Sequence, residues 1–148
     1  SAAQMCIRDR PTTGWALGLS VGGMVAMYVI YRVLEPGEIS MITIATIALI
    51  AIVSPRGHAL IFCRHGYDML LGKRWKATLK TFILTTVLII AIYSAIFDPR
   101  TWIFVIPVVL LSEKKAQDWV WAAVPNPARR RLRRIWSDAS KTNSSEEE

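Results

Sequence analysis

The chain has 148 residues, of which 53% are hydrophobic, and its formal net charge is +7. These values suit either a compact soluble domain or a small bundle of membrane-spanning helices. The charged residues cluster between long uncharged stretches, which argues against a soluble helical domain, where charges follow one face of every helix. We therefore predict an all-α integral membrane protein with three to four transmembrane helices, arranged as two helical hairpins with a basic amphipathic cytoplasmic tail.

The first ten residues, Ser-Ala-Ala-Gln-Met-Cys-Ile-Arg-Asp-Arg, read as the translation of a sequencing-library adapter that ends in a transposon mosaic end. Agreement over the whole of residues 1–10 is hard to assign to chance, so we expect an adapter-derived, non-native leader and set it aside. The alternative is a genuine short basic N-terminus. If the leader is foreign, the natural start is unknown and the chain is a possible fragment.

Residues 11–56 are expected to form the first transmembrane hairpin. Residues 14–34, interrupted by a single arginine near their end, are long enough to cross about 30 Å of hydrocarbon at about 1.5 Å per residue. Glu35-Pro36-Gly37-Glu38 then predicts a tight turn, because Pro fixes its own φ and Gly permits a reversal. The uncharged residues 39–53 form the second span, which we expect Ser54-Pro55-Arg56-Gly57 to end.

Small residues recur every four positions along one face of the first span, as in a glycine zipper: Gly14, Gly18, Gly22 and Ala26. We call this set the small-residue ladder. Such ladders let two helix backbones approach closely. The ladder predicts either a self-association surface or pore-lining helix, or packing against the chain's own second span. The small residues that this span offers are Ala45, Ala48 and Ala51.

Residues 57–78 are expected to form a basic cytoplasmic loop at the membrane interface. Residues 58–71 mix apolar and polar side chains, which is typical of an interfacial amphipathic helix. Basic and aromatic residues expected at the membrane surface follow: Lys73, Arg74, Trp75 and Lys76.

Four residues of this loop could carry ligand or acid–base chemistry: His58, Cys63, His65 and Asp68. His65 and Asp68 are three apart and could share a helix face as a general base. The four lack the repeated spacing of a zinc site, and Cys63 stands in a segment that reads as cytoplasmic. We predict no disulfide, catalytic residue, metal or cofactor, and we lean against an enzyme.

Residues 79–112 are expected to form the second transmembrane hairpin. Its first span covers residues 79–97, and Asp98-Pro99-Arg100 breaks the helix. Residues 102–111 are apolar but would extend only roughly 15 Å, so they form either a short fourth span or a re-entrant segment. We prefer a full span, because a re-entrant segment would leave the arginine-rich tail outside the cytoplasm.

Charge asymmetry orients the chain. Residues 56–80 hold six Lys or Arg against one Asp, whereas the turn at residues 35–38 holds two acids and no base. The positive-inside rule places the basic segment, and with it both ends of the observed chain, in the cytoplasm. No ionisable residue is expected deep within a span, which argues against an ion-coupled transporter.

Residues 113–140 are expected to form a cytoplasmic amphipathic tail, and the polar, acidic residues 141–148 a disordered end. Apolar residues at positions 132, 135, 136 and 139 predict a basic helix lying on anionic lipid headgroups. The tail residues expected at the membrane surface are Arg129, Arg130, Arg131, Arg133, Arg134 and Trp136. The alternative is that these arginines only fix the topology; nucleic-acid binding is not expected.

These features predict a small helical subunit or scaffold of a larger membrane complex, packing through the small-residue ladder. The second hypothesis is an oligomeric channel or holin-like pore, and the third a membrane enzyme using His65 and Asp68. The expected partners are the lipid bilayer and either further copies of the chain or other membrane subunits. The expected location is a bacterial or archaeal inner membrane, with a multi-pass topology.

Overall fold

The computed structural model describes residues 11–35, 37, 40–124, 130–131 and 134–137. Over these residues the chain is all-helical, and no strand occurs among them. Three helices are long and apolar enough to cross a membrane, namely α1 (Pro11–Leu34), α2 (Met41–Leu70) and α3 (Arg74–Phe97). The predicted all-α class is thereby confirmed, and the three apolar helices are compatible with a multi-pass membrane protein. The expected leader and the expected acidic end lie outside the described residues.

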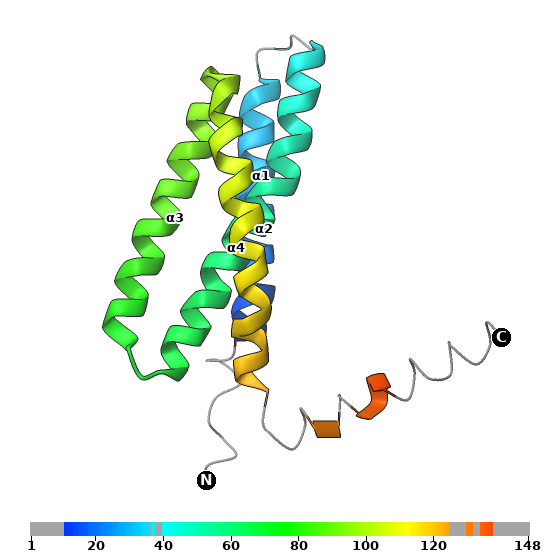
Figure 1. Cartoon of the computed structure of the whole chain (residues 1–148). Coiled ribbons are helices and arrows are strands. Elements are labelled where there is room, and N and C mark those ends of the chain that lie inside the picture. Colours follow the sequence, from blue (N-terminus) through cyan, green and yellow to red (C-terminus); the bar gives the residue numbers. More distant parts are fainter. Residues whose placement is uncertain (1–10, 36, 38–39, 125–129, 132–133, 138–148) are drawn as a thin grey trace, which may run out of the picture.

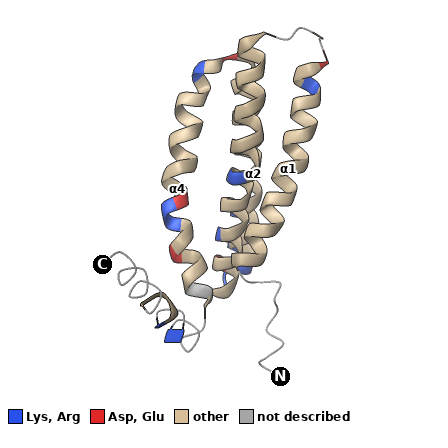
Figure 2. Ribbon diagram, turned by 90° about the vertical axis from the view of Figure 1, so that its right-hand side faces the viewer, with Lys and Arg blue, Asp and Glu red and all other residues tan. Residues whose placement is uncertain are grey.

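The helices α1 and α2 lie side by side and run in opposite directions (Figures 1 and 2). Gly37, with a φ of 76°, adopts the left-handed conformation in the connection between them. Ser40 then caps α2, since its hydroxyl accepts a hydrogen bond from the Thr43 amide at 3.1 Å.

The second helix does not end at Ser54-Pro55-Arg56-Gly57, as we expected from the sequence. Instead, α2 continues for 30 residues with Pro55 inside it, so residues 57–70 extend this helix and form no separate interfacial segment. Proline removes one backbone donor, a loss that neighbouring helices can compensate in a membrane bundle. Here the Ser54 hydroxyl donates a hydrogen bond to the Gly22 carbonyl at 2.9 Å, which ties this part of α2 to α1.

After a turn in which Gly72 has a φ of 75°, α3 rises along the bundle and a 3-10 turn, η3 (Pro99–Thr101), leads into α4 (Trp102–Ala123). Asp98 caps η3 by accepting a hydrogen bond from the Arg100 amide at 3.0 Å. The helix α4 continues past the expected end at Leu111 into a charged second half. Because of these charges, α4 is not among the helices apolar enough to span a membrane.

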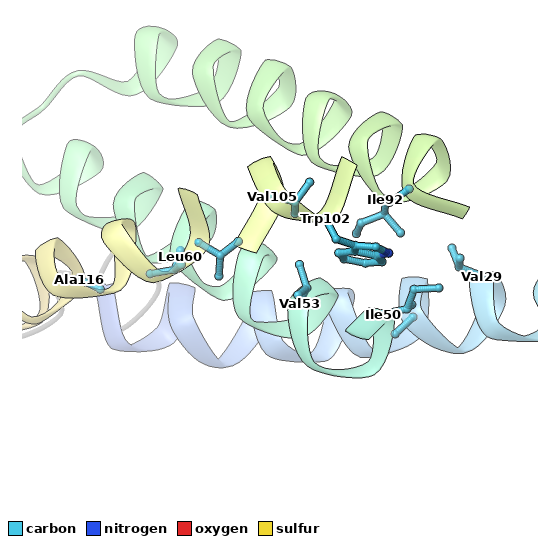
Figure 3. Packing of buried hydrophobic residues seen from close by; sticks show 11 residues of the cluster. Val29, Ile50, Val53, Leu60, Ile92, Trp102, Val105 and Ala116 are labelled. Atoms are coloured by element: carbon cyan, nitrogen blue, oxygen red, sulfur yellow. The ribbon is translucent and has the colours of Figure 1, made fainter. Parts of the chain in front are cut away.

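The core joins all four helices around α2. Ile50 and Val53 of α2 pack with Val29 of α1, Ile92 of α3 and Trp102 of α4 (Figure 3). Further along α4, the buried cluster continues through Val105, Val109 and Ala116. Since α2 contributes buried residues along nearly its whole length, it is the central helix on which the other three are placed.

Candidate functional site

The small-residue ladder of α1 packs directly against α2. A Cβ atom added at Gly22 would lie 2.6 Å from Pro55 Cα, and one at Gly18 would lie 2.5 Å from Ala59 Cα. A Cβ atom at Gly14 would overlap the Phe62 carbonyl. Real Cβ atoms essentially never approach other atoms within 3.0 Å, so only glycine permits this spacing. We call this contact, from Gly14 to Ala26 along α1, the α1–α2 seam.

The partner of the ladder is not the face that the sequence suggested. Ala45, Ala48 and Ala51 are exposed, and the ladder instead meets the second half of α2. Buried small residues also occur there, at Ala59, Cys63 and Gly66, spaced four and three apart. That spacing is visible in the sequence. We did not assign it to the second helix, because we expected this helix to end at Pro55.

Two polar side chains, those of Ser54 and His58, are buried in the α1–α2 seam. Beside the Ser54 hydroxyl lies His58, which has no exposed surface and donates a hydrogen bond from Nδ1 to the Ser54 carbonyl at 2.8 Å. The other ring nitrogen, Nε2, has no hydrogen-bond partner among the described residues. Because His58 is closed off from the surface, it cannot meet a substrate in this arrangement.

A charged group joins α2 and α4 within the length of the bundle. Arg56 of α2 forms an ion pair with Glu113 of α4, and their side chains are 50% and 33% exposed. Its level follows from the neighbouring Pro55, which contacts Gly22 at the middle of α1. Figure 2 shows a basic position partway along α2 and a group of acidic and basic positions partway along α4, with a further acidic position toward the end of α4.

The structure corrects the expected position of Arg56. The sequence analysis places Arg56 at the end of the second span, but the continuation of α2 places it within that helix. Exposed Lys114 and Lys115 follow Glu113 on α4. Neither lysine forms an ion pair with another described residue.

His65 and Asp68, which the third hypothesis uses as a general-base pair, each contact α3 instead. His65 Nδ1 lies 2.9 Å from the Thr81 hydroxyl, and the Asp68 carboxylate lies 3.7 Å from Lys80 Nζ. Next to His65, the Arg64 guanidinium carbon lies 5.5 Å from the centre of the Trp119 ring in a cation–π contact. These contacts fasten α3 and α4 to the end of α2. Among the described residues, no three His, Cys, Asp or Glu side chains gather closely enough to hold a metal.

The residues expected at the membrane surface lie near the end of the bundle that holds the α2–α3 turn. Lys73, Arg74, Trp75 and Lys76 are exposed there, and Trp75 retains 89% of its accessible surface. The end of α4 reaches the same side of the molecule (Figure 1).

Part of the expected amphipathic tail is described. Arg130, Arg131 and Arg134 are helical and exposed, whereas Arg129 and Arg133 lie outside the described residues. Trp136 packs edge-on against Trp121 of α4, with 5.3 Å between ring centres. This contact holds the tail segment beside α4.

Comparison with known proteins identifies no relative: no family model matches the chain, and neither a curated protein nor a solved structure shows significant similarity.

Proposed function

We propose that this chain is a multi-pass subunit of a larger membrane assembly, and that it contacts its partner through the charged face of α4. The observation that carries the proposal is the charged group at mid-height. Arg56 lies beside Pro55, level with the middle of α1, and pairs with Glu113, which Lys114 and Lys115 follow. All four residues retain exposed surface. Lipid hydrocarbon cannot hydrogen-bond to such groups, whereas another polypeptide can.

The energetic argument rests on the two lysines. A lysine at the centre of a membrane helix costs about 2.5–3.5 kcal/mol on insertion scales. Two of them would cost about 5–7 kcal/mol, which is comparable with the whole stability of a typical domain, about 5–15 kcal/mol. Lys115 lies four residues before Trp119, about 6 Å of helix, so snorkelling toward the basic end offsets part of this cost. A polar partner surface removes this cost.

The proposed topology has two helical hairpins, α1–α2 and α3–α4, with the α2–α3 turn and both ends of the observed chain in the cytoplasm. It is supported by Lys73, Arg74, Lys76 and Lys80, which gather at that turn and follow the positive-inside rule. Arg56 no longer contributes to this count, because it belongs to the middle of α2. We propose that the basic end contacts anionic lipid headgroups.

The partner surface is assigned to α4 and not to the small-residue ladder, because α2 already covers the ladder. A partner helix could not approach Gly18 or Gly22 without displacing α2. The proposed role of the ladder is therefore to fix the α1–α2 pair as a rigid support for the charged face.

The test compares two pairs of lysines in the native membrane. Replacing Lys114 and Lys115 by Leu should release the chain from its assembly, seen as faster migration of the solubilised complex in a native gel. Replacing Lys73 and Lys76 by Leu removes the same charge at the end of the bundle and should leave migration unchanged. If lipid alone surrounded α4, the leucines at 114 and 115 would be neutral or stabilising, and unchanged migration would refute the proposal.

The second candidate is a pore formed by several copies, and the same charged face favours it, because charges at mid-height would suit a water-filled path. Cysteine introduced at Lys115, in the assembled complex, distinguishes the two. Modification by a water-soluble thiol reagent that does not cross membranes indicates a pore, whereas protection indicates a protein contact. Phe104, 74% exposed on the apolar half of α4, is the matched position expected to stay protected in both cases.

A further inference from the structure

We propose that the groove between α2, α3 and α4 binds one anionic phospholipid, with an acyl chain along the groove and the phosphate on Arg64. The groove encloses a cavity of about 380 Å³. Its floor is apolar and buried, formed by Leu60, Val105 and Val109. Its rim is apolar and exposed, and includes Val87, Phe104 and Val108.

The dimensions fit a lipid chain better than a partner helix. The groove follows α4 from Thr101 to Trp119, which corresponds to about 27 Å of helix. One leaflet of the hydrocarbon core is about 15 Å thick, so an acyl chain rising from one surface has room within this length. A helix about 10 Å across would need roughly 2,000 Å³ over the same length, several times the volume present. The cavity instead falls in the usual range of ligand pockets, about 300–1,000 Å³.

Specific side-chain contacts define the groove, because they join both α3 and α4 to α2. On one side, Thr81 and Lys80 of α3 bind α2 side chains, and Leu88 packs onto Gly57, where an added Cβ atom would lie 2.7 Å from Leu88 Cδ2. On the other side, Glu113 of α4 pairs with Arg56 of α2. These contacts place α3 and α4 on separate sides of α2 and keep the space between them open.

Charge at the end of the groove selects the headgroup. Arg64 lines the groove and forms no ion pair with a described residue. The carboxylates of Asp68 and Glu113 are already paired with Lys80 and Arg56. The Arg64 guanidinium carbon lies 5.5 Å from the centre of the Trp119 ring, and no hydrogen bond or ion pair with a described residue uses its N–H donors. These planar, forked donors suit a phosphate.

Arg64 also lies at the right depth for a phosphate. Its neighbour Cys63 is level with Gly14, where the apolar part of α1 begins, and its neighbour His65 binds Thr81, where the apolar part of α3 begins. Arg64 thus lies at the boundary between the apolar helices and the basic end of the bundle. A phosphate bound there would direct its acyl chain into the apolar groove.

The test is lipid retention by the purified full-length chain, measured by native mass spectrometry. The delipidated protein is incubated with phosphatidylglycerol or with phosphatidylcholine carrying the same acyl chains. We expect one phosphatidylglycerol per chain to be retained in preference to phosphatidylcholine. Arg64→Gln should lower this retention about tenfold, since hydrogen bonds to charged groups are among the strongest in proteins. Arg74→Gln removes the same charge from an exposed position at the same end but outside the groove lining, and it should lower retention of this one lipid clearly less than Arg64→Gln does.

A second pair of variants tests the acyl-chain site separately from the headgroup site. Val108→Trp fills the groove from its exposed rim and should reduce retention, whereas Ile103→Trp, also exposed on α4 but outside the lining, should not. If Arg64→Gln fails to fold, Arg64→Lys keeps the charge, loses the planar fork and should reduce retention partially. Equal retention of the two lipids, or equal losses in Arg64→Gln and Arg74→Gln, would overturn the proposal.

Discussion

Two adjacent glycines of α1 offer a sharp test of the α1–α2 seam. Gly22 lies in the seam, where an added Cβ atom would stand 2.6 Å from Pro55 Cα and Ser54 O. Gly23 has nothing within 4 Å of the same added atom. Both residues belong to the same helix turn, so Gly22→Ala and Gly23→Ala change helix propensity equally and differ only in what the new methyl group meets.

The magnitude follows from the geometry. To bring the new contacts from 2.6 Å to the 3.0 Å limit, the two helices must move apart, which also stretches the 2.9 Å hydrogen bond from Ser54 to the Gly22 carbonyl. Overpacking costs about 1–3 kcal/mol and a weakened hydrogen bond about 0.5–1.5 kcal/mol. The gain in helix propensity returns up to about 1 kcal/mol. We expect Gly22→Ala to lower the free energy of unfolding by about 1–3 kcal/mol, and Gly23→Ala to leave it unchanged or raise it.

The assay is reversible unfolding in mixed micelles of a mild detergent and dodecyl sulfate, followed by circular dichroism on the full-length chain. Both variants are measured beside the parent protein, and the difference between them is the readout. Equal unfolding free energies for Gly22→Ala and Gly23→Ala would refute the close approach of α1 and α2.

Further predictions follow from the other contacts of α2. Gly57→Ala should cost less than Gly22→Ala, below about 1 kcal/mol, because the new methyl group meets the flexible end of Leu88 and not a backbone; the same unfolding assay measures this. Glu113→Gln should destabilise the fold by roughly 1–3 kcal/mol by leaving Arg56 unpaired, less than for a fully buried pair because both side chains are partly exposed. Replacing both partners by Met should recover most of that loss in the unfolding assay. Cys63 has no exposed surface, so maleimide should modify it only at the rate of unfolding, which mass spectrometry can follow; fast modification of the folded chain would contradict its burial.

The two spans that could be predicted from the sequence, α1 and α3, are those whose apolar stretches contain no strong breaker. The extent of α2 could not be predicted in this way. Pro55 and the polar residues after it are local signals for a helix end, but contact with the glycines of α1 outweighs them. Similarly, α4 continues past Leu111 because Ala116 and Trp119 pack against the bundle. The charged side chains of Lys114 and Lys115 stay exposed.

Only the part of the candidate site that lies within one helix, the glycine spacing of α1, could be predicted from the sequence. Gly18 and Gly22 stand out because their spacing repeats within one helix. Their contacts with Ala59 and Ser54 lie on the following helix, far along the chain, and they depend on the register of the two helices. The pair of Arg56 and Glu113 is also distant in sequence and involves a helix that was not expected to extend so far. No local pattern in the sequence marks such pairs.

The α1–α2 seam also has a consequence for the order in which the protein is assembled during synthesis. Ser54 and Pro55 cover Gly22. Gly14 precedes Gly22 in the chain, but Phe62, which covers it, follows Pro55. The ribosome therefore makes the partner of Gly22 before it makes the partner of Gly14. Contacts near the α1–α2 turn therefore close the shortest loops. Once they have formed, each contact farther from the turn adds only a small entropic cost of loop closure. We expect the seam to close from the turn toward the N-terminus as α2 emerges. Until residues 54–62 have been synthesised, the glycine face of α1 lacks the part of α2 that covers it in the folded chain.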